Sequence, residues 1–168
     1  MKQLKTLLLA TALCIGTVSF TNAQSKIAHI NTQELITSMP EMKEAQKQLE
    51  TASKKYQVDI QAAGTEFQTL LKQYEAEAST KTEEENGKRG QEIQEKQQRI
   101  QQFQADAQKD LQKKEMDLLQ PITEKAKVAI LKIGRAQGFD YVLDSSQGVT
   151  ILADGKNLLD DVKKELGI

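Results

Sequence analysis

The feature that most constrains this chain is a long stretch, from Pro40 to about Gln137, that is rich in Glu, Gln, Lys and Ala. These residue types favour helices. Apolar residues recur within it at heptad spacing, in one series through Met42, Leu49, Tyr56, Ala63 and Leu70 and in a second through Ile60, Phe67 and Tyr74, with Ser53 in the same register. This alternation places one apolar stripe along a helix and is typical of a coiled-coil seam.

The apolar pattern is interrupted from Ser79 to Gly90, where we expect the chain to reverse and form a helical hairpin. Two positions for the turn compete. Thr82 and Glu85 have the spacing of a capping box that starts a second helix, whereas Asn86-Gly87 favours a turn a few residues later. The apolar stripe is thinnest here, so we expect a flexible, weakly held distal end.

The pattern resumes in a returning helix, in which Pro121 is the main irregularity. Its apolar positions are Ile93, Ile100, Phe103, Ala107, Leu111, Leu118, Ile122, Ala126, Ala129 and Ile133. Proline removes the hydrogen bond to the carbonyl of Asp117 and predicts a kink or a restart of the helix. Gly138 is a suitable residue to end the helix.

The first residues have the pattern of a secretory signal peptide. Lys2 and Lys5 precede a short apolar core, and Ala23 is a small residue at the expected cleavage point. The core is shorter than the roughly 20 apolar residues of a membrane-spanning helix, so we expect residues 1–23 to be removed on export. The only cysteine, Cys14, lies within this segment, so the mature chain has no thiol chemistry.

Short strands are predicted on both sides of the helical stretch. Ile27–Ile30 is a mostly apolar run, after which Asn31 and Glu34 mark a helix start and Pro40 the first turn of the next helix. Between Phe139 and Asp144, apolar residues recur at every second position, with Asp140, Val142 and Asp144 between them, and this is strand spacing. Val149–Leu152 is predicted as a further strand that forms a hairpin with it.

A last helix is expected after the turn at Asp154-Gly155. Asn157 can cap it, and its acidic and basic residues match the helix dipole. Its predicted apolar face consists of Leu158, Leu159, Val162 and Leu166.

These elements predict a mainly α fold with a small β body, from which a long antiparallel helical hairpin projects. We assign residues 24–39 and 122–168 to the body and residues 40–121 to the hairpin arm. Three short strands leave open edges that invite pairing with other chains. We therefore expect a β-barrel-like body that is completed by oligomerisation.

The sequence shows no pattern for catalysis or for a cofactor. His29 is the only histidine and is expected to be structural, because catalytic and metal sites need several groups. The acidic runs Asp160-Asp161 and Glu83–Glu85 are explained by helix ends and solvated surface. After removal of Lys2 and Lys5 the 23 basic residues become 21 against 24 acidic ones, a charge of −3, which argues against nucleic-acid binding. We expect no enzyme, metal or cofactor.

The large apolar residues of the arm are the candidate contacts for other proteins. The candidates are Tyr56, Ile60, Phe67, Leu71, Tyr74 and Phe103. One interpretation is that they pack inside the hairpin, as heptad positions usually do. The other is that residues outside the seam, such as Leu71 and Phe103, face a shared cavity and bind unfolded segments weakly at many points.

The layout of the chain carries a family resemblance. It consists of the opening strand Lys26–Asn31, the charged hairpin, the stretch Leu119–Lys125, and Gly138–Asp144 followed by a strand, a turn and a short helix. In this order they resemble the Skp/OmpH family of periplasmic chaperones, over essentially all of the mature chain.

Membership would imply a homotrimer with a shared β-barrel and three projecting hairpins around a cavity. It would also imply an ATP-independent holdase that keeps unfolded outer-membrane proteins from aggregating. The mildly acidic mature chain departs from the strongly basic members of the family and argues against contact with lipopolysaccharide or anionic membranes. The competing hypothesis is a structural coiled-coil scaffold of the envelope.

Overall fold

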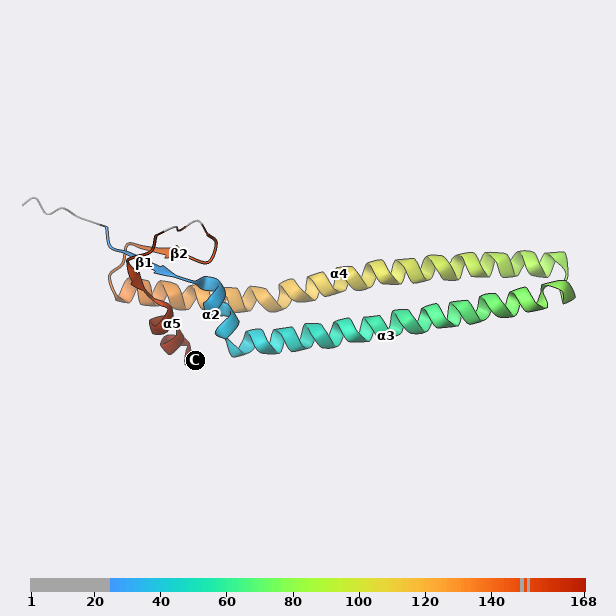
Figure 1. Cartoon of the computed structure of the whole chain (residues 1–168), viewed down its shortest axis with the longest axis horizontal. Coiled ribbons are helices and arrows are strands. Elements are labelled where there is room, and N and C mark those ends of the chain that lie inside the picture. The colour runs from blue at the N-terminus through green and yellow to red at the C-terminus, as the bar shows by residue number, and fades with distance from the viewer. Residues whose placement is uncertain (1–24, 149, 151) are drawn as a thin grey trace, which may run out of the picture.

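The computed structural model describes residues 25–148, 150 and 152–168. Two long antiparallel helices, α3 (Pro40–Glu77) and α4 (Glu83–Ala136), project from a small body, as Figure 1 shows. The mainly helical fold with a small sheet, expected from the sequence, is therefore confirmed. The predicted signal peptide and its cleavage after Ala23 lie outside the described residues.

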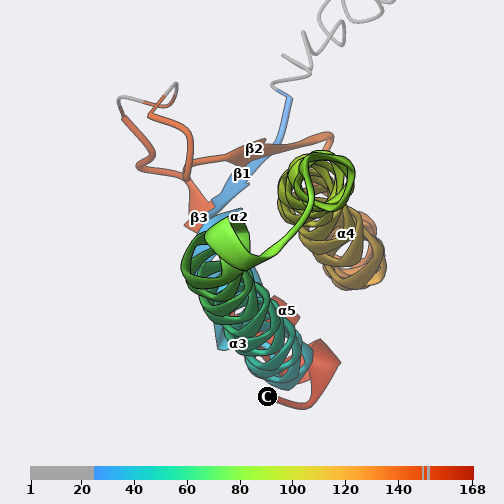
Figure 2. The same ribbon diagram turned by 90° about the vertical axis from the view of Figure 1, so that its right-hand side faces the viewer.

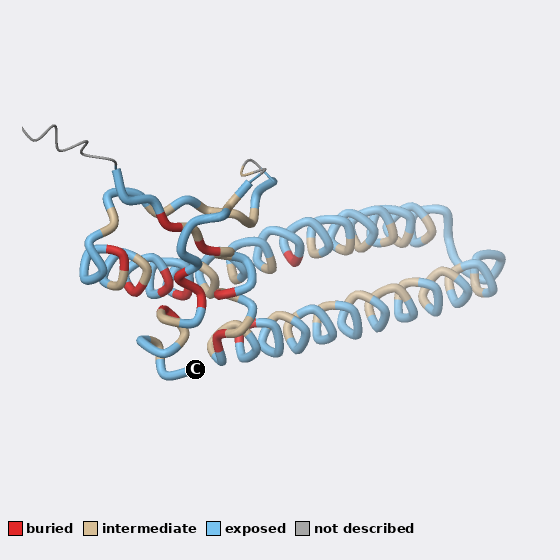
Figure 3. The backbone as a smooth tube through the Cα atoms, turned by 60° about the vertical axis from the view of Figure 1, so that its left-hand side comes forward, coloured by how far each residue is buried: buried red, intermediate tan, exposed pale blue. Residues whose placement is uncertain are grey.

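The two long helices pack along the predicted seam. They have 38 and 54 residues, or about 57 and 81 Å at 1.5 Å per residue. The apolar heptad residues named above are half-buried or buried, except Ser53, which is exposed. Figure 3 shows that almost all fully buried residues lie in the body, while the arm is exposed outside its seam. The arm is thus a two-helix rod that shields one stripe.

The first helices begin as the sequence predicts. α2 (Thr32–Ser38) is capped by Asn31, whose side-chain oxygen accepts a hydrogen bond from the Glu34 amide at 2.9 Å. Met39 then separates α2 from α3, and Pro40 occupies the first turn of α3, where its missing N–H needs no partner.

The chain reverses at Lys81 and Thr82, after the short 3₁₀ helix η1 (Ala78–Thr80). The capping box of Thr82 and Glu85 starts α4, so the first of the two predicted turn positions is confirmed. The alternative was wrong: Asn86 and Gly87 lie inside α4. Two orphan amides at the start of α4 are satisfied by the capping box, and this favours its position over the Asn-Gly pair. Figure 2 shows this end of the hairpin from the front.

Pro121 lies inside α4, which continues through it, so the predicted restart was wrong. Pro121 and Asp117 are both exposed, so water can hydrate the carbonyl that loses its hydrogen bond. Close by, Lys125 of α4 forms an ion pair with Glu41 of α3. The division of the chain near residue 121 stays a prediction, since one helix crosses it.

The sheet differs from the expected hairpin. β1 (Ile27–Ile30) is central and pairs in parallel with β2 (Tyr141–Asp144) and β3 (Lys156–Asn157). The predicted strand Val149–Leu152 was wrong for Thr150 and Leu152, which are not in a strand, while Val149 and Ile151 lie outside the described residues. Hydrogen bonding to the central β1 selects the third strand, and this requirement is invisible in the local apolar pattern.

α4 ends as expected, but the N-cap residue of the last helix is Leu158 and not the predicted Asn157. α4 ends in a Schellman motif, with Gly138 at φ +71° and the Phe139 amide donating to the Gly134 carbonyl at 3.0 Å. α5 (Leu159–Leu166) starts with the Leu159 amide bonded to the Asn157 side chain at 3.0 Å. Its predicted apolar face is confirmed, since Leu158, Leu159 and Val162 are buried and Leu166 packs against them.

One face of the sheet forms the core of the body. Ala28 and Ile30 of β1 are buried, and their neighbours are α2, α4 and α5 residues such as Leu35, Ala126 and Val162. α4 approaches so closely that a Cβ at Gly134 would lie 3.0 Å from Val142.

The opposite face, which we call the outer sheet face, carries Ile27, His29, Tyr141 and Leu143. Of its apolar members, Ile27 is 48% exposed, Tyr141 is 58% exposed and Leu143 is 45% exposed.

Candidate functional site: the helical arm

The structure places all six candidate contact residues on the two long helices of the arm, five on α3 and Phe103 on α4. Tyr56, Ile60, Phe67, Leu71, Tyr74 and Phe103 are all half-buried. Tyr56 and Phe103 meet directly, with ring centroids 6.0 Å apart in an edge-to-face arrangement. Such pairs stabilise packing beyond the area they bury. Tyr56 and Phe103 therefore help to hold the two helices together, and all six side chains still present part of their surface to solvent.

Phe103 is a seam residue, and its assignment outside the seam was wrong. It follows Ile100 and precedes Ala107 in the half-buried or buried row of α4, and it contacts Tyr56 across the hairpin. The Tyr56 hydroxyl in turn donates a hydrogen bond to Asp110 at 2.7 Å. This bond, with some burial and the carboxylate charge, raises the pKa of Tyr56, because ionisation would place two negative charges together.

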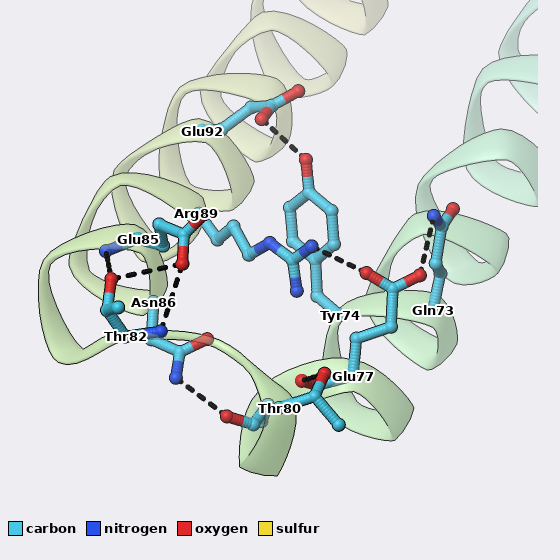
Figure 4. A network of polar contacts seen from close by, with 10 residues as sticks. Gln73, Tyr74, Glu77, Thr80, Thr82, Glu85, Asn86, Arg89 and Glu92 are labelled. Atoms are coloured by element: carbon cyan, nitrogen blue, oxygen red, sulfur yellow. Dashed lines mark hydrogen bonds and ion pairs between the residues drawn. The ribbon is translucent and has the colours of Figure 1, made fainter.

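Figure 4 shows a polar network at the end of the arm, which we call the tip clasp and define by Tyr74, Glu77, Arg89 and Glu92. The Arg89 guanidinium lies over the Tyr74 ring, 4.5 Å from its centroid, and donates to Glu77 at 2.5 Å. The Tyr74 hydroxyl donates to Glu92 at 2.6 Å. Hydrogen bonds from Gln73 and Arg89 lower the pKa of Glu77, so the clasp keeps its charge at neutral pH.

The turn beyond the clasp is also tied across the hairpin. The Asn86 side chain donates to the Ala78 carbonyl at 2.9 Å, and the Thr82 amide donates to Glu85 at 3.0 Å. Hydrogen bonds from the Thr82 backbone and side chain lower the pKa of Glu85. The apolar stripe is thin here, as predicted, but polar bonds replace it; the flexibility of the distal end stays a prediction.

A shallow groove of about 690 Å³ follows the flank of α3 beside the seam. Its apolar lining consists of Val58, Ala62 and Leu70. The other side chains that line it are polar, and Thr65 and Thr69 are among them. Val58 is 63% exposed, and Met116 on α4 is 65% exposed. Both were missed from the sequence, although each is a large apolar residue away from the heptad positions, and that departure is the signal that could have found them.

In residues 25–148, 150 and 152–168, no group of three His, Cys, Asp or Glu side chains is placed to hold a metal ion. Over the same residues, no helix has both the length and the apolarity that crossing a bilayer requires.

Comparisons with known proteins agree with this architecture. Residues 26–166 match the family described as outer membrane protein (OmpH-like). The chaperone protein Skp of Photorhabdus laumondii is 26% identical over 165 residues, covering 97% of this chain and 99% of that protein, and Skp of Photorhabdus luminescens is equally similar. The structure of an OmpH-like outer membrane chaperone from Caulobacter crescentus has the same fold, with a TM-score of 0.76, 18% identity, and 86% and 85% of the two chains covered. The chain therefore belongs to the Skp/OmpH family.

Proposed function

We propose that this protein is an ATP-independent holdase of the periplasm, which binds unfolded outer-membrane proteins and prevents their aggregation. The observation that carries the proposal is the arm itself. Its large seam residues, such as Phe67 and Phe103, are only half-buried, and its flank exposes Val58 along a groove. The similarity to proteins named chaperone supports it.

An arm of this kind suits weak binding at many points. An unfolded segment exposes apolar side chains, and each contact with a half-buried residue such as Phe67 or an exposed one such as Val58 removes a little apolar surface from water. Several arms on one oligomer would multiply these contacts by raising the effective concentration. Release then needs no nucleotide, because the client leaves when its own folding buries the same surface more completely.

We further propose that the body assembles into a homotrimer through the outer sheet face. A parallel sheet is normally covered on both faces, and within the described chain helices cover only the face with Ala28 and Ile30. The outer sheet face pairs Ile27 with Tyr141 and His29 with Leu143. It holds no carboxylate or ammonium group of these strands, so copies can meet there without charge repulsion.

The test of the holdase is an aggregation assay. A urea-unfolded outer-membrane β-barrel protein is diluted into buffer without nucleotide, with and without the purified mature chain, and light scattering and the mass of any complex are followed. Suppression at a fixed ratio near one client per oligomer supports the holdase. No suppression, with a stable oligomer, would refute it and favour the structural scaffold.

A matched pair of variants locates the binding surface. Val58→Asp places a charge on the exposed groove and is expected to weaken suppression several-fold. Gln57→Asp introduces the same charge at the neighbouring exposed polar position and is expected to leave suppression unchanged. Equal activity of both variants would remove the α3 groove from the proposed binding surface.

A further inference from the structure

His29 is the polar member of an otherwise apolar surface. It is the only histidine of the chain and lies in β1, the central strand, between Leu143 of β2 and Asn157 of β3. By strand alternation it shares the outer sheet face with Ile27, away from the buried Ala28 and Ile30. A histidine therefore stands in the middle of the surface that we propose to be covered by other copies.

The imidazole has an unusual environment. Its Nδ1 atom is buried and has no hydrogen-bond partner among the described residues. Buried polar atoms are nearly always hydrogen-bonded, and an exception calls for an explanation. A neutral imidazole can tolerate one unpaired acceptor, whereas a charged imidazolium would carry a second N–H donor and a positive charge in the same place.

The charged groups of the elements around His29 are engaged elsewhere. On β2, Asp144 accepts hydrogen bonds from Thr32 and Ser146 at the opposite face, and Asp140, just before β2, accepts one from the Lys26 amide. On β3, Lys156 pairs with Asp161 of α5 at 3.1 Å.

The titratable neighbour on the same face is the phenol of Tyr141. No carboxylate of the described residues is within ion-pair distance of His29, so nothing in the body compensates a positive charge there.

We propose that His29 makes the assembly of the body sensitive to pH: copies associate through the outer sheet face while His29 is neutral, and protonation of His29 weakens their association. This inference rests on the self-association proposed above. Histidine is the side chain that changes charge between about pH 5 and 8. Covering the outer sheet face removes the remaining water around the ring, which disfavours the charged form in the assembly more than in the free chain.

The sign and size of the effect follow from linkage. If the free chain binds a proton at His29 that the assembly does not, acidification favours the free chain. Each such histidine weakens the association constant up to tenfold per pH unit, or up to about a thousandfold for three copies. The effect disappears above the range where the free chain takes up the proton.

The experiment measures the association constant of the mature chain by sedimentation equilibrium at pH 7.5 and pH 5.5, at constant ionic strength and without a histidine tag. The wild-type protein is expected to associate at least 100-fold more weakly at pH 5.5. His29→Val, which suits a strand, and His29→Gln, which stays neutral, are expected to associate equally at both pH values. The Asp144 carboxylate has a lowered pKa and stays charged throughout this range.

The outcomes separate this inference from the proposed self-association. A wild-type oligomer that is equally stable at both pH values, or variants that keep the wild-type pH dependence, would overturn the role of His29 and leave the oligomer intact. A monomer at pH 7.5 would overturn both. If both variants misfold, NMR titration of the single imidazole of the wild-type protein decides. The midpoint of this titration must move to higher pH when the oligomer is diluted and dissociates. A midpoint that does not move refutes the linkage.

Discussion

Leu35→Ala is the substitution whose effect on stability the structure defines best. Leu35 lies in α2 with 0% of its surface exposed, and it belongs to the core cluster that includes Ile30, Met39 and Val162. Removing three buried carbon atoms loses about 2.4 kcal/mol at roughly 0.8 kcal/mol each. The cavity left behind raises the expected loss in free energy of unfolding to about 3–5 kcal/mol.

Urea unfolding, followed by circular dichroism at a fixed protein concentration, measures this loss. Val58→Ala is the control, since its side chain is 63% exposed and surface substitutions usually change stability by less than about 0.5 kcal/mol. A loss below about 1 kcal/mol for Leu35→Ala would refute the argument, because it would mean that the core around α2 is open or collapses without cost.

Leu143→Ala extends the comparison to the outer sheet face. Leu143 is 45% exposed in the single chain, so its truncation is expected to affect the protomer less than Leu35→Ala does. If copies cover this face, the effect grows as the protein concentration is raised, because association then stabilises the wild type more than the variant. An effect that is independent of concentration would contradict association through Leu143.

Three further substitutions test local features. Thr82→Ala removes the capping box of α4 and is expected to lower stability by about 0.5–2 kcal/mol, with Thr82→Ser as a neutral control in the same urea assay. Gly138→Ala forces an alanine into φ +71° and is expected to cost about 1–2 kcal/mol in thermal unfolding; an unchanged melting temperature would contradict the strain. Burial alone would raise the pKa of Asp144, but hydrogen bonds from Thr32 and Ser146 outweigh it and lower the pKa. The ionised Asp144 therefore stabilises the fold above the ordinary carboxyl range, and this contribution is lost as the pH falls through the lowered pKa. Asp144→Asn should be less stable at pH 7, with a flatter dependence below pH 4, and parallel curves for both proteins would exclude this role.

The arm could be predicted from the sequence because its information is local and repeated. The heptad residues from Met42 to Ile133 are half-buried or buried as expected, since a periodic stripe determines which face of a helix is covered. The choice between Thr82 and Asn86 as the site of reversal depended on weighing two valid local signals. The capping box of Thr82 and Glu85 gives hydrogen-bond partners to amides at the start of the helix, whereas a turn at Asn86 would leave them unpaired. The structure has the capping box.

The sheet and the candidate surface could be predicted only in part. The third strand, Lys156–Asn157, is two residues long and polar, and its register depends on β1 from the other end of the chain. Tyr56, Phe67 and Phe103 were found because they are aromatic, and the heptad register also gives their place in the seam. Val58 was missed because one apolar residue outside a periodic pattern resembles the ordinary background of a surface.

The pairing of β1 with β2 and β3 also has a consequence for the order in which the parts of the chain fold. The Lys26 amide meets the Asp140 side chain across 114 residues, and closing a bare loop of roughly 110 residues costs about 4 kcal/mol beyond a constant term. Packing of α3 against α4 can start next to the turn at Thr82 and extend along the arm, because each new contact joins residues that are already close together. It brings both ends of the loop together before the sheet forms. The body is complete only when Lys156 and Asn157 have paired with β1, whereas the arm can already be formed before that step. Substitutions in the tip clasp should accordingly slow refolding of the body, which lies at the far end of the molecule.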